Sequence, residues 1–135
     1  MRKQITFALT LMLIVAGITA CQKDEQTSNK KNMIGKWQLA KIETTVAGSA
    51  MVSYTGIASD YFEFRNNEED EVVINLKSNS HIGTFTVLDG TGVNINYGGK
   101  LYIAQINTLT PNKLEFTADI QGATPKTTEK YYLTR

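Results

Sequence analysis

Residues 114–120 read Leu-Glu-Phe-Thr-Ala-Asp-Ile, and apolar side chains alternate with polar ones along the whole stretch. Successive side chains of a β-strand point to opposite faces of a sheet, so this alternation predicts a strand with one apolar face. Strands of this kind are typical of antiparallel sheets that cover a core on one side and face water on the other.

The same kind of pattern recurs along the chain, and turn residues separate one run from the next. Gly98-Gly99 is typical of a two-residue hairpin loop, because both glycines accept a positive φ. Short turns join neighbouring strands antiparallel, which indicates an up-and-down meander. No stretch after residue 32 has a convincing helical period. The eight predicted strands cover residues 37–42, 61–65, 71–77, 81–88, 93–97, 101–109, 114–120 and 128–134.

Eight such strands can form either a sandwich or a closed barrel. A meander favours the barrel, because pairing the first strand with the last removes both exposed edges. We therefore expect an all-β chain with a single antiparallel, up-and-down, eight-stranded β-barrel over residues 33–135. The interior of a barrel of this size is filled by side chains or holds one small ligand.

The first residues have the layout of a secretory signal peptide. Arg2 and Lys3 precede an almost wholly apolar stretch over residues 5–18, and Thr19-Ala20 then precedes Cys21. A permanent transmembrane anchor and an ordinary cleaved signal peptide are the alternatives. Residues 18–21, Ile-Thr-Ala-Cys, resemble the lipobox of bacterial lipoproteins. This resemblance implies a signal peptide over residues 1–20 and a diacylglycerol on Cys21, the first residue of the mature chain.

Residues 21–32 are expected to form a lipidated, flexible tether. Gln22-Lys23-Asp24-Glu25 resembles the surface-export signal of lipoproteins in one phylum of Gram-negative bacteria. That resemblance implies a lipoprotein anchored in the outer membrane and exposed on the cell surface; the alternative is a charged, solvated tether. Residues 26–32 are polar, and their composition predicts a linker without structure.

A second resemblance concerns the predicted barrel. Gly35-Lys36-Trp37 matches the Gly-x-Trp signature of lipocalins, and Arg135 falls where that family places an Arg against the Trp. The resemblance implies that the Trp37 indole plugs the closed end of the barrel under the Arg135 guanidinium. The chain departs from the family because it lacks a Thr-Asp-Tyr signature and a C-terminal helix, and because the domain is much shorter than an ordinary lipocalin.

The segment from Thr44 to Ser59 contains no charged residue and is too long for a hairpin turn. In lipocalins the loop after the first strand lies over the barrel mouth. One interpretation is a lid or contact surface in which Met51, Tyr54 and Ile57 touch a ligand or partner. The alternative is an edge extension or a short helix that plugs the end of the barrel.

Catalytic and metal-binding chemistry find little support, and we expect no enzyme, no cofactor and no metal. The chain has one Cys and one His, and its net charge of +1 does not indicate a nucleic-acid partner. Ser80 and His81 are adjacent in a predicted strand, so they point to opposite faces and cannot pair as nucleophile and base. The acidic run over residues 68–71 lacks the spacing of a calcium loop and is interpreted as a solvated hairpin tip.

Two classes of function remain. The first is a membrane-anchored binding module that holds a small apolar ligand in a cavity lined by Val, Ile, Phe and Tyr beneath residues 46–58. The second is an interaction protein with a filled barrel, which docks on an outer-membrane complex, a host protein or a protease. The volume of the interior separates the two.

Overall fold

The computed structural model describes residues 27–135, and the predicted signal peptide and Cys21 lie outside the described residues. A short helix over residues 27–33 precedes nine strands. Within residues 27–135, no helix has the length and apolar character needed to cross a membrane. The strands are β1 (Gly35–Val46), β2 (Val52–Thr55), β3 (Tyr61–Phe64), β4 (Glu71–Leu76), β5 (Asn79–Val87), β6 (Gly92–Tyr97), β7 (Lys100–Leu109), β8 (Lys113–Ile120) and β9 (Thr127–Thr134).

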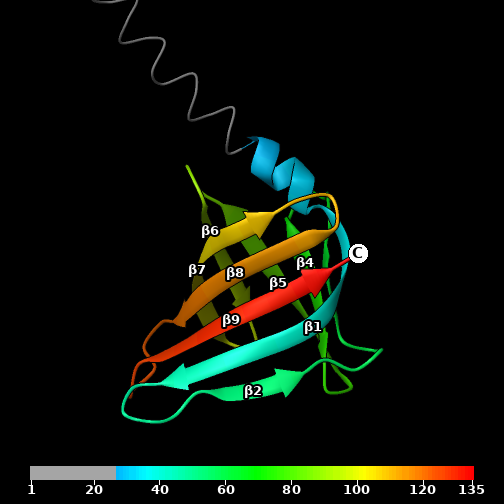
Figure 1. The fold of residues 1–135 in the computed structure, drawn as a ribbon. Coiled ribbons are helices and arrows are strands. Elements are labelled where there is room, and N and C mark those ends of the chain that lie inside the picture. Colours follow the sequence, from blue (N-terminus) through cyan, green and yellow to red (C-terminus); the bar gives the residue numbers. More distant parts are fainter. Residues whose placement is uncertain (1–26) are drawn as a thin grey trace, which may run out of the picture.

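Eight of the nine strands form a closed antiparallel barrel, as predicted (Figure 1). The strands from β3 to β9 pair in sequence order, and β1 pairs with both β3 and β9. The contact between β1 and β9 is long, since it runs from Gln38 opposite Thr134 to Val46 opposite Thr127. The sequence interpretation of a lipocalin-like, up-and-down barrel is thus confirmed.

The ninth strand, β2, is an addition to the predicted set. β3 covers only the first part of β1, from Gly35 to Gln38, whereas β1 continues to Val46. β2 pairs with the part that β3 leaves uncovered, with Lys41 opposite Thr55 and Thr44 opposite Val52. The uncharged segment between the first two predicted strands therefore contains an edge extension of the barrel wall, one of the alternatives left open by the sequence.

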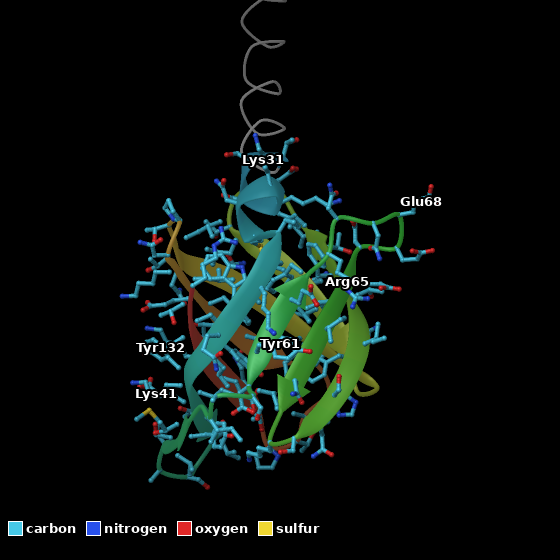
Figure 2. All side chains as sticks on the ribbon, turned by 90° about the vertical axis from the view of Figure 1, so that its right-hand side faces the viewer. Lys31, Lys41, Tyr61, Arg65, Glu68 and Tyr132 are labelled. Carbon is cyan, nitrogen blue, oxygen red and sulfur yellow. The ribbon has the colours of Figure 1, made fainter. Side chains whose placement is uncertain are left out.

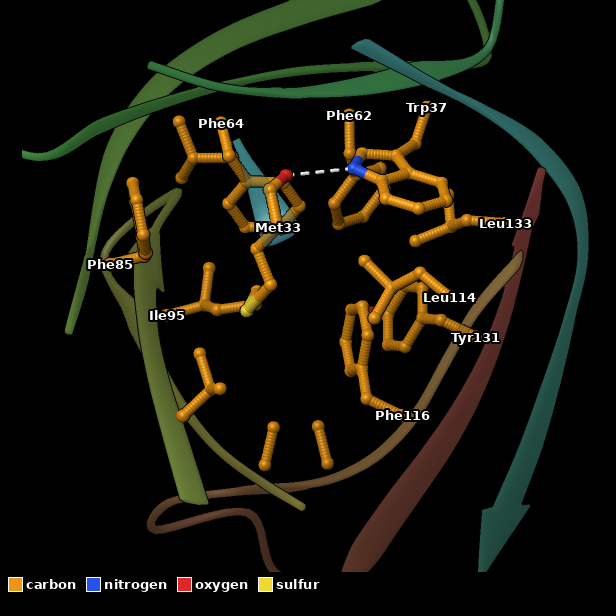
Figure 3. Packing of buried hydrophobic residues seen from close by; sticks show 14 of the residues in the cluster. Met33, Trp37, Phe62, Phe64, Phe85, Ile95, Leu114, Phe116, Tyr131 and Leu133 are labelled. Carbon is orange, nitrogen blue, oxygen red and sulfur yellow. Dashed lines mark hydrogen bonds between the residues drawn. The ribbon is translucent and has the colours of Figure 1, made fainter. Parts of the chain in front are cut away.

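Aromatic and aliphatic side chains pack together in the interior of the barrel (Figure 3). Phe62 lies edge-on to Tyr131 with 5.4 Å between ring centroids, and Phe64 lies edge-on to Phe85 at 5.0 Å. Phe116 stacks on Tyr131 at 4.7 Å. Edge-on and offset rings are the favoured geometries for aromatic pairs, so these contacts add to the gain from burying the rings.

One end of the barrel is covered by the helix over residues 27–33; we call it the closed end (Figure 2). The Met33 side chain is 0% exposed, and the Met33 carbonyl accepts a hydrogen bond from the Trp37 indole at 2.8 Å. Asn29 donates to the Gly90 carbonyl, and Lys30 pairs with Asp70 at 2.8 Å. The prediction of a linker without structure is therefore wrong for residues 27–32. This polar segment is helical, and the tertiary contacts hold it in place.

The other end of the barrel, which we call the open end, carries β2, the two-residue turns after β4 and β6, and the loop between β8 and β9. The predicted hairpin turn at Gly98-Gly99 is confirmed, with φ angles of 59° and 73°. Lys77 and Ser78 form the other turn with φ angles of 52° and 66°. Both turns are of the kind whose twist matches that of the flanking strands.

Candidate functional site

A cavity of about 160 Å³ opens at the open end of the barrel, above the aromatic core. A water molecule takes a share of about 30 Å³ of the liquid, so the cavity exceeds the size of one water. Its floor includes Tyr131, which stacks on Phe116. Its lining residues are Ile42, Thr44, Tyr54, Leu76, Lys77, Tyr97, Tyr102, Glu129 and Tyr131.

Three tyrosines dominate one part of the lining. The rings of Tyr97 and Tyr102 stack at 4.6 Å with an angle of 10° between their planes. The hydroxyl of Tyr97 forms hydrogen bonds with those of Tyr102 and Tyr131. Burial raises the pKa of all three phenols above the ordinary value for tyrosine, and the charge of a nearby carboxylate raises it further. The three rings are therefore neutral at physiological pH.

That carboxylate belongs to Glu129, which the alternation of β9 places on the same face as the buried Tyr131 and Leu133. Glu129 accepts a short hydrogen bond from the Tyr131 hydroxyl. Its second oxygen lies 3.5 Å from the Thr44 hydroxyl on β1. A carboxylate has room for about four hydrogen bonds, so Glu129 keeps free acceptor capacity.

A groove of about 450 Å³ adjoins the cavity at the loop between β8 and β9. Glu129 lines both hollows, so the carboxylate stands where the cavity meets the groove. Lys100 and residues 120–125 form most of the groove's remaining wall. A ligand held in the cavity can therefore extend into the groove past Glu129.

The Asp60 carboxylate holds residues at the rim of the cavity in place through hydrogen bonds. Its side chain is 0% exposed and accepts hydrogen bonds from the Tyr54 hydroxyl at 2.6 Å, from the Ile57 amide at 3.0 Å and from the Lys77 amide at 2.8 Å. Burial alone raises the pKa of Asp60, but these hydrogen bonds outweigh it and hold the pKa below its ordinary value. Asp60 thus fixes Tyr54 and the turn at Lys77, which both line the cavity.

The structure places only one of the three residues suggested as ligand or partner contacts in the lining of the cavity. Tyr54 lines the cavity, with the Lys77 ammonium 4.7 Å above its ring. Met51 and Ile57 do not line it, and they are 57% and 48% exposed at the surface beside β2. Tyr54 lies in β2 opposite Ile42, another residue of the cavity lining, whereas Met51 and Ile57 lie outside β2 on either side of it.

The residues of the Gly-x-Trp signature lie together at the closed end. The Arg135 guanidinium lies 3.9 Å from the centroid of the Trp37 ring, as the resemblance implied, and Trp37 is fully buried. Gly35 has a φ of 121°, and a Cβ at this position would lie 2.9 Å from an Arg135 nitrogen. The positive φ favours glycine there, and a side chain at this position would also have to displace the end of the flexible Arg135 side chain.

The remaining candidate residues lie at the surface. Ser80 and His81 are exposed in β5, and the His81 ring lies 6.3 Å from the Tyr97 ring near the cavity. Among residues 27–135, no group of three or more His, Cys, Asp or Glu side chains is arranged to hold a metal ion. The acidic hairpin tip is tied to its surroundings at its last residues, through the pairs Lys30–Asp70 and Arg65–Glu71.

Sequence reasoning missed Asp60 and Glu129 as functional positions. Asp60 lies between an uncharged segment and a strand, and nothing in the sequence distinguishes a buried carboxylate from a solvated one. The sequence did contain a signal for Glu129, because alternation within the predicted strand over residues 128–134 places Glu129 on the same face as Tyr131. A charged residue such as Glu129 is not expected on the interior face of a barrel strand, but the open end of a barrel can accommodate charged side chains.

Comparison with known proteins agrees with this geometry. A family model described as a lipocalin-like domain matches residues 33–116, which is more than half of the chain. The match begins at Met33, which packs under Trp37, and ends within β8. No curated protein and no solved structure matches the chain. The chain therefore belongs to the family of lipocalin-like domains.

Proposed function

We propose that the chain is a non-enzymatic binding module that takes a small, largely apolar ligand at the open end of its barrel. The observation that carries this proposal is the 160 Å³ cavity, which lies where the aromatic core stops. Ile42, Leu76 and Tyr97 supply apolar wall there, and burial of a ligand's apolar surface against them provides the gain in free energy. The filled remainder of the barrel limits the ligand to a small molecule.

The proposal includes a lipid anchor on Cys21, in the bacterial outer membrane and with the domain exposed on the cell surface. The lipobox resemblance at residues 18–21 supports the anchor. The fold adds a geometric reason for the arrangement. Residue 27 is the first described residue and lies in the helix that covers the closed end, so an anchor joined through it is attached to the end of the barrel opposite the cavity. The cavity then faces away from the bilayer.

The anchor is tested by Cys21→Ala, because this change removes the only sulfhydryl group in the chain. We expect the wild-type chain in the membrane fraction with an acylated N-terminal cysteine by mass spectrometry, and the variant in the soluble fraction. Ser28→Ala, a small change in the exposed start of the helix, serves as the control and stays with the membrane. A variant that remains membrane-bound overturns this part of the proposal.

The cavity is tested by a pair of adjacent substitutions on β1. Thr44 lines the cavity, whereas Thr45 is exposed on the opposite face of the strand. Thr44→Phe fills the cavity, and we expect the affinity for an apolar fluorophore such as N-phenyl-1-naphthylamine to fall by about tenfold or more, which corresponds to about 1.4 kcal/mol. Thr45→Phe leaves the affinity unchanged. If both variants bind the dye like the wild type, the cavity is not the binding site.

One observation favours the second candidate function, docking on a larger partner at the membrane surface. Met51, Val52 and Ile57 are large apolar residues exposed around β2, and β2 is paired with β1 only. Large apolar side chains exposed on and beside an edge strand are a feature of interaction surfaces. In this case Val52→Lys abolishes co-purification of the partner while the Thr44→Phe variant retains it.

A further inference from the structure

The Glu129 carboxylate has no cationic partner within the described part of the chain. The ion pairs found there join Lys30 to Asp70, Lys41 to Glu43, Arg65 to Glu63 and Glu71, Lys113 to Glu115, and Lys126 to Asp119. Glu129 is instead held by two hydroxyls, those of Tyr131 and Thr44. It therefore brings a negative charge to the junction of the cavity and the groove, and none of these ion pairs neutralises it.

The surroundings of Glu129 favour the binding of a cation. Tyr97 and Tyr102 line the same cavity, and both phenols are neutral at physiological pH. Neutral aromatic rings attract cations, and the half-buried carboxylate of Glu129 can form a charge-assisted hydrogen bond with one. The hydroxyl of Tyr131 already donates to one carboxylate oxygen and so orients the group.

The two lysines near the site are placed differently. Lys77 lines the cavity, but its ammonium lies over the Tyr54 ring, and its charge acts on the buried carboxylate of Asp60. Lys100 lines the outer groove. Lys77 thus lies over an aromatic ring and interacts with Asp60 at longer range, whereas Glu129 forms no ion pair with a residue of the described chain and faces the ligand space.

We infer that the cavity takes a ligand with an ammonium group on a short apolar or aromatic body, an arylalkylamine. The ammonium donates hydrogen bonds to Glu129, and the apolar body lies against Leu76, Tyr54 and Tyr97. This inference rests on the proposed function, since it names the chemical class of ligand for the same cavity. It adds that the recognised group is a positive charge.

Three probes of the same shape and different charge test the inference. The full-length chain in detergent micelles is titrated by calorimetry with 2-phenylethylammonium, 2-phenylethanol and 3-phenylpropanoate, and micelles alone serve as the blank. We expect the ammonium to bind about tenfold or more tightly than the alcohol, as a hydrogen bond to a charged group implies, and the carboxylate to bind most weakly.

Glu129→Gln assigns the preference to one side chain. This variant keeps the shape of Glu129 and removes its charge, so the ammonium loses about tenfold in affinity while the alcohol is unaffected. Glu68→Gln makes the same change on an exposed residue at the closed end and leaves all three affinities as they are. Unchanged binding of the alcohol also shows that the Glu129→Gln variant is folded.

The outcomes separate this inference from the proposed function. Equal binding of ammonium and alcohol, tighter binding of the carboxylate, or an ammonium affinity that Glu129→Gln does not lower overturns the cation inference and leaves the binding module in place. Binding of none of the three probes overturns the inference as well, while the loss of dye affinity in Thr44→Phe decides the proposed function separately. The order of the three affinities in the wild-type chain tests the inference even if Glu129→Gln does not fold.

Discussion

Arg135 lies over Trp37, with 3.9 Å between the guanidinium carbon and the centroid of the ring. The same guanidinium donates hydrogen bonds to the carbonyls of Pro111 at 2.8 Å, Ile34 at 2.9 Å and Asn32 at 3.2 Å. One side chain at the end of the last strand therefore holds the end of the helix, the start of β1 and the turn before β8. The closed end of the barrel depends on this arrangement, whereas at the open end the Asp60 carboxylate joins Tyr54, Ile57 and the turn at Lys77.

Arg135→Ala removes the cation–π contact and leaves three carbonyl groups without their donor. We expect the free energy of unfolding to fall by about 1–3 kcal/mol. A cation–π contact is worth about 0.5–2 kcal/mol, and the three hydrogen bonds add less than their usual value of about 0.5–1.5 kcal/mol each, because Arg135 is exposed and water can replace it as the donor. Urea unfolding followed by the fluorescence of Trp37 measures the change directly, because Trp37 is the sole tryptophan.

Arg65→Ala is the matched control for this measurement. Arg65 is also exposed, and it pairs with Glu71 at 3.1 Å and Glu63 at 3.7 Å on the surface of the closed end. Surface ion pairs are worth about 0–1 kcal/mol, so we expect a small change. Equal losses in the two variants mean that Arg135 acts as an ordinary surface charge and does not hold the closed end together.

The helix before the barrel is expected to contribute to stability through Met33. Met33 is 0% exposed and packs into the core, whereas Met51 is 57% exposed beside β2. Met33→Ala therefore costs about 2–5 kcal/mol, the range for truncating a buried methionine, and Met51→Ala changes the free energy of unfolding by less than about 0.5 kcal/mol. Thermal unfolding of the two variants tests this, and similar melting temperatures mean that the helix does not belong to the folded unit.

Asp60 is expected to make stability depend on acid pH. The folded pKa of Asp60 lies below its ordinary value, so its contribution is complete above the ordinary pKa of about 3.9 and is lost as the pH falls through the lowered folded pKa. Asp60→Asn loses about 1–3 kcal/mol at neutral pH, because the amide cannot accept from Tyr54, Ile57 and Lys77 together. The difference from the wild type shrinks at acid pH.

The difference in the free energy of unfolding between Asp60→Asn and the wild type is measured by urea unfolding at neutral pH and at about pH 3, which is below the ordinary pKa of an aspartate. Asp89→Asn is the control, since Asp89 is exposed in the turn between β5 and β6 and its substitution is expected to have little effect at either pH. A difference between Asp60→Asn and the wild type that stays constant with pH shows that the lost interactions do not involve the ionised carboxylate.

The sequence was sufficient for the barrel because each of the eight wall strands carries its own alternation, as in residues 114–120. It was insufficient for β2, because the alternation in Val52-Ser53-Tyr54-Thr55 is only four residues long, and the segment becomes a strand by pairing with the part of β1 that β3 leaves free. The helix over residues 27–33 was missed for a similar reason. Its sequence is polar, and what fixes it is the distant contact of Lys30 with Asp70 and the burial of Met33.

The candidate site was predictable only in part. The Gly-x-Trp signature pointed to Trp37 and Arg135, which lie in β1 and directly after β9, and the structure places the Arg135 guanidinium over the Trp37 ring. The cavity was expected beneath residues 46–58, and Tyr54 does line it. Its other walls come from strands far apart in the sequence, such as Tyr97 in β6 and Glu129 in β9, and only closure of the barrel brings them together.

The tyrosines of the cavity are expected to make stability depend on alkaline pH as well. Burial raises the pKa of Tyr102 above the ordinary value of about 10, and the neighbouring Tyr97 and Glu129 raise it further. Its contribution is therefore complete below about pH 10 and is lost above it, because the unfolded chain releases the phenolic proton while the folded chain retains it.

Tyr102→Phe costs about 0.5–1.5 kcal/mol at neutral pH through the lost hydrogen bond to Tyr97. Phenylalanine cannot ionise, so the variant loses less stability than the wild type between neutral pH and about pH 11, and the difference between the two narrows. Urea unfolding at the two pH values measures this, and a difference that widens with pH contradicts the raised pKa.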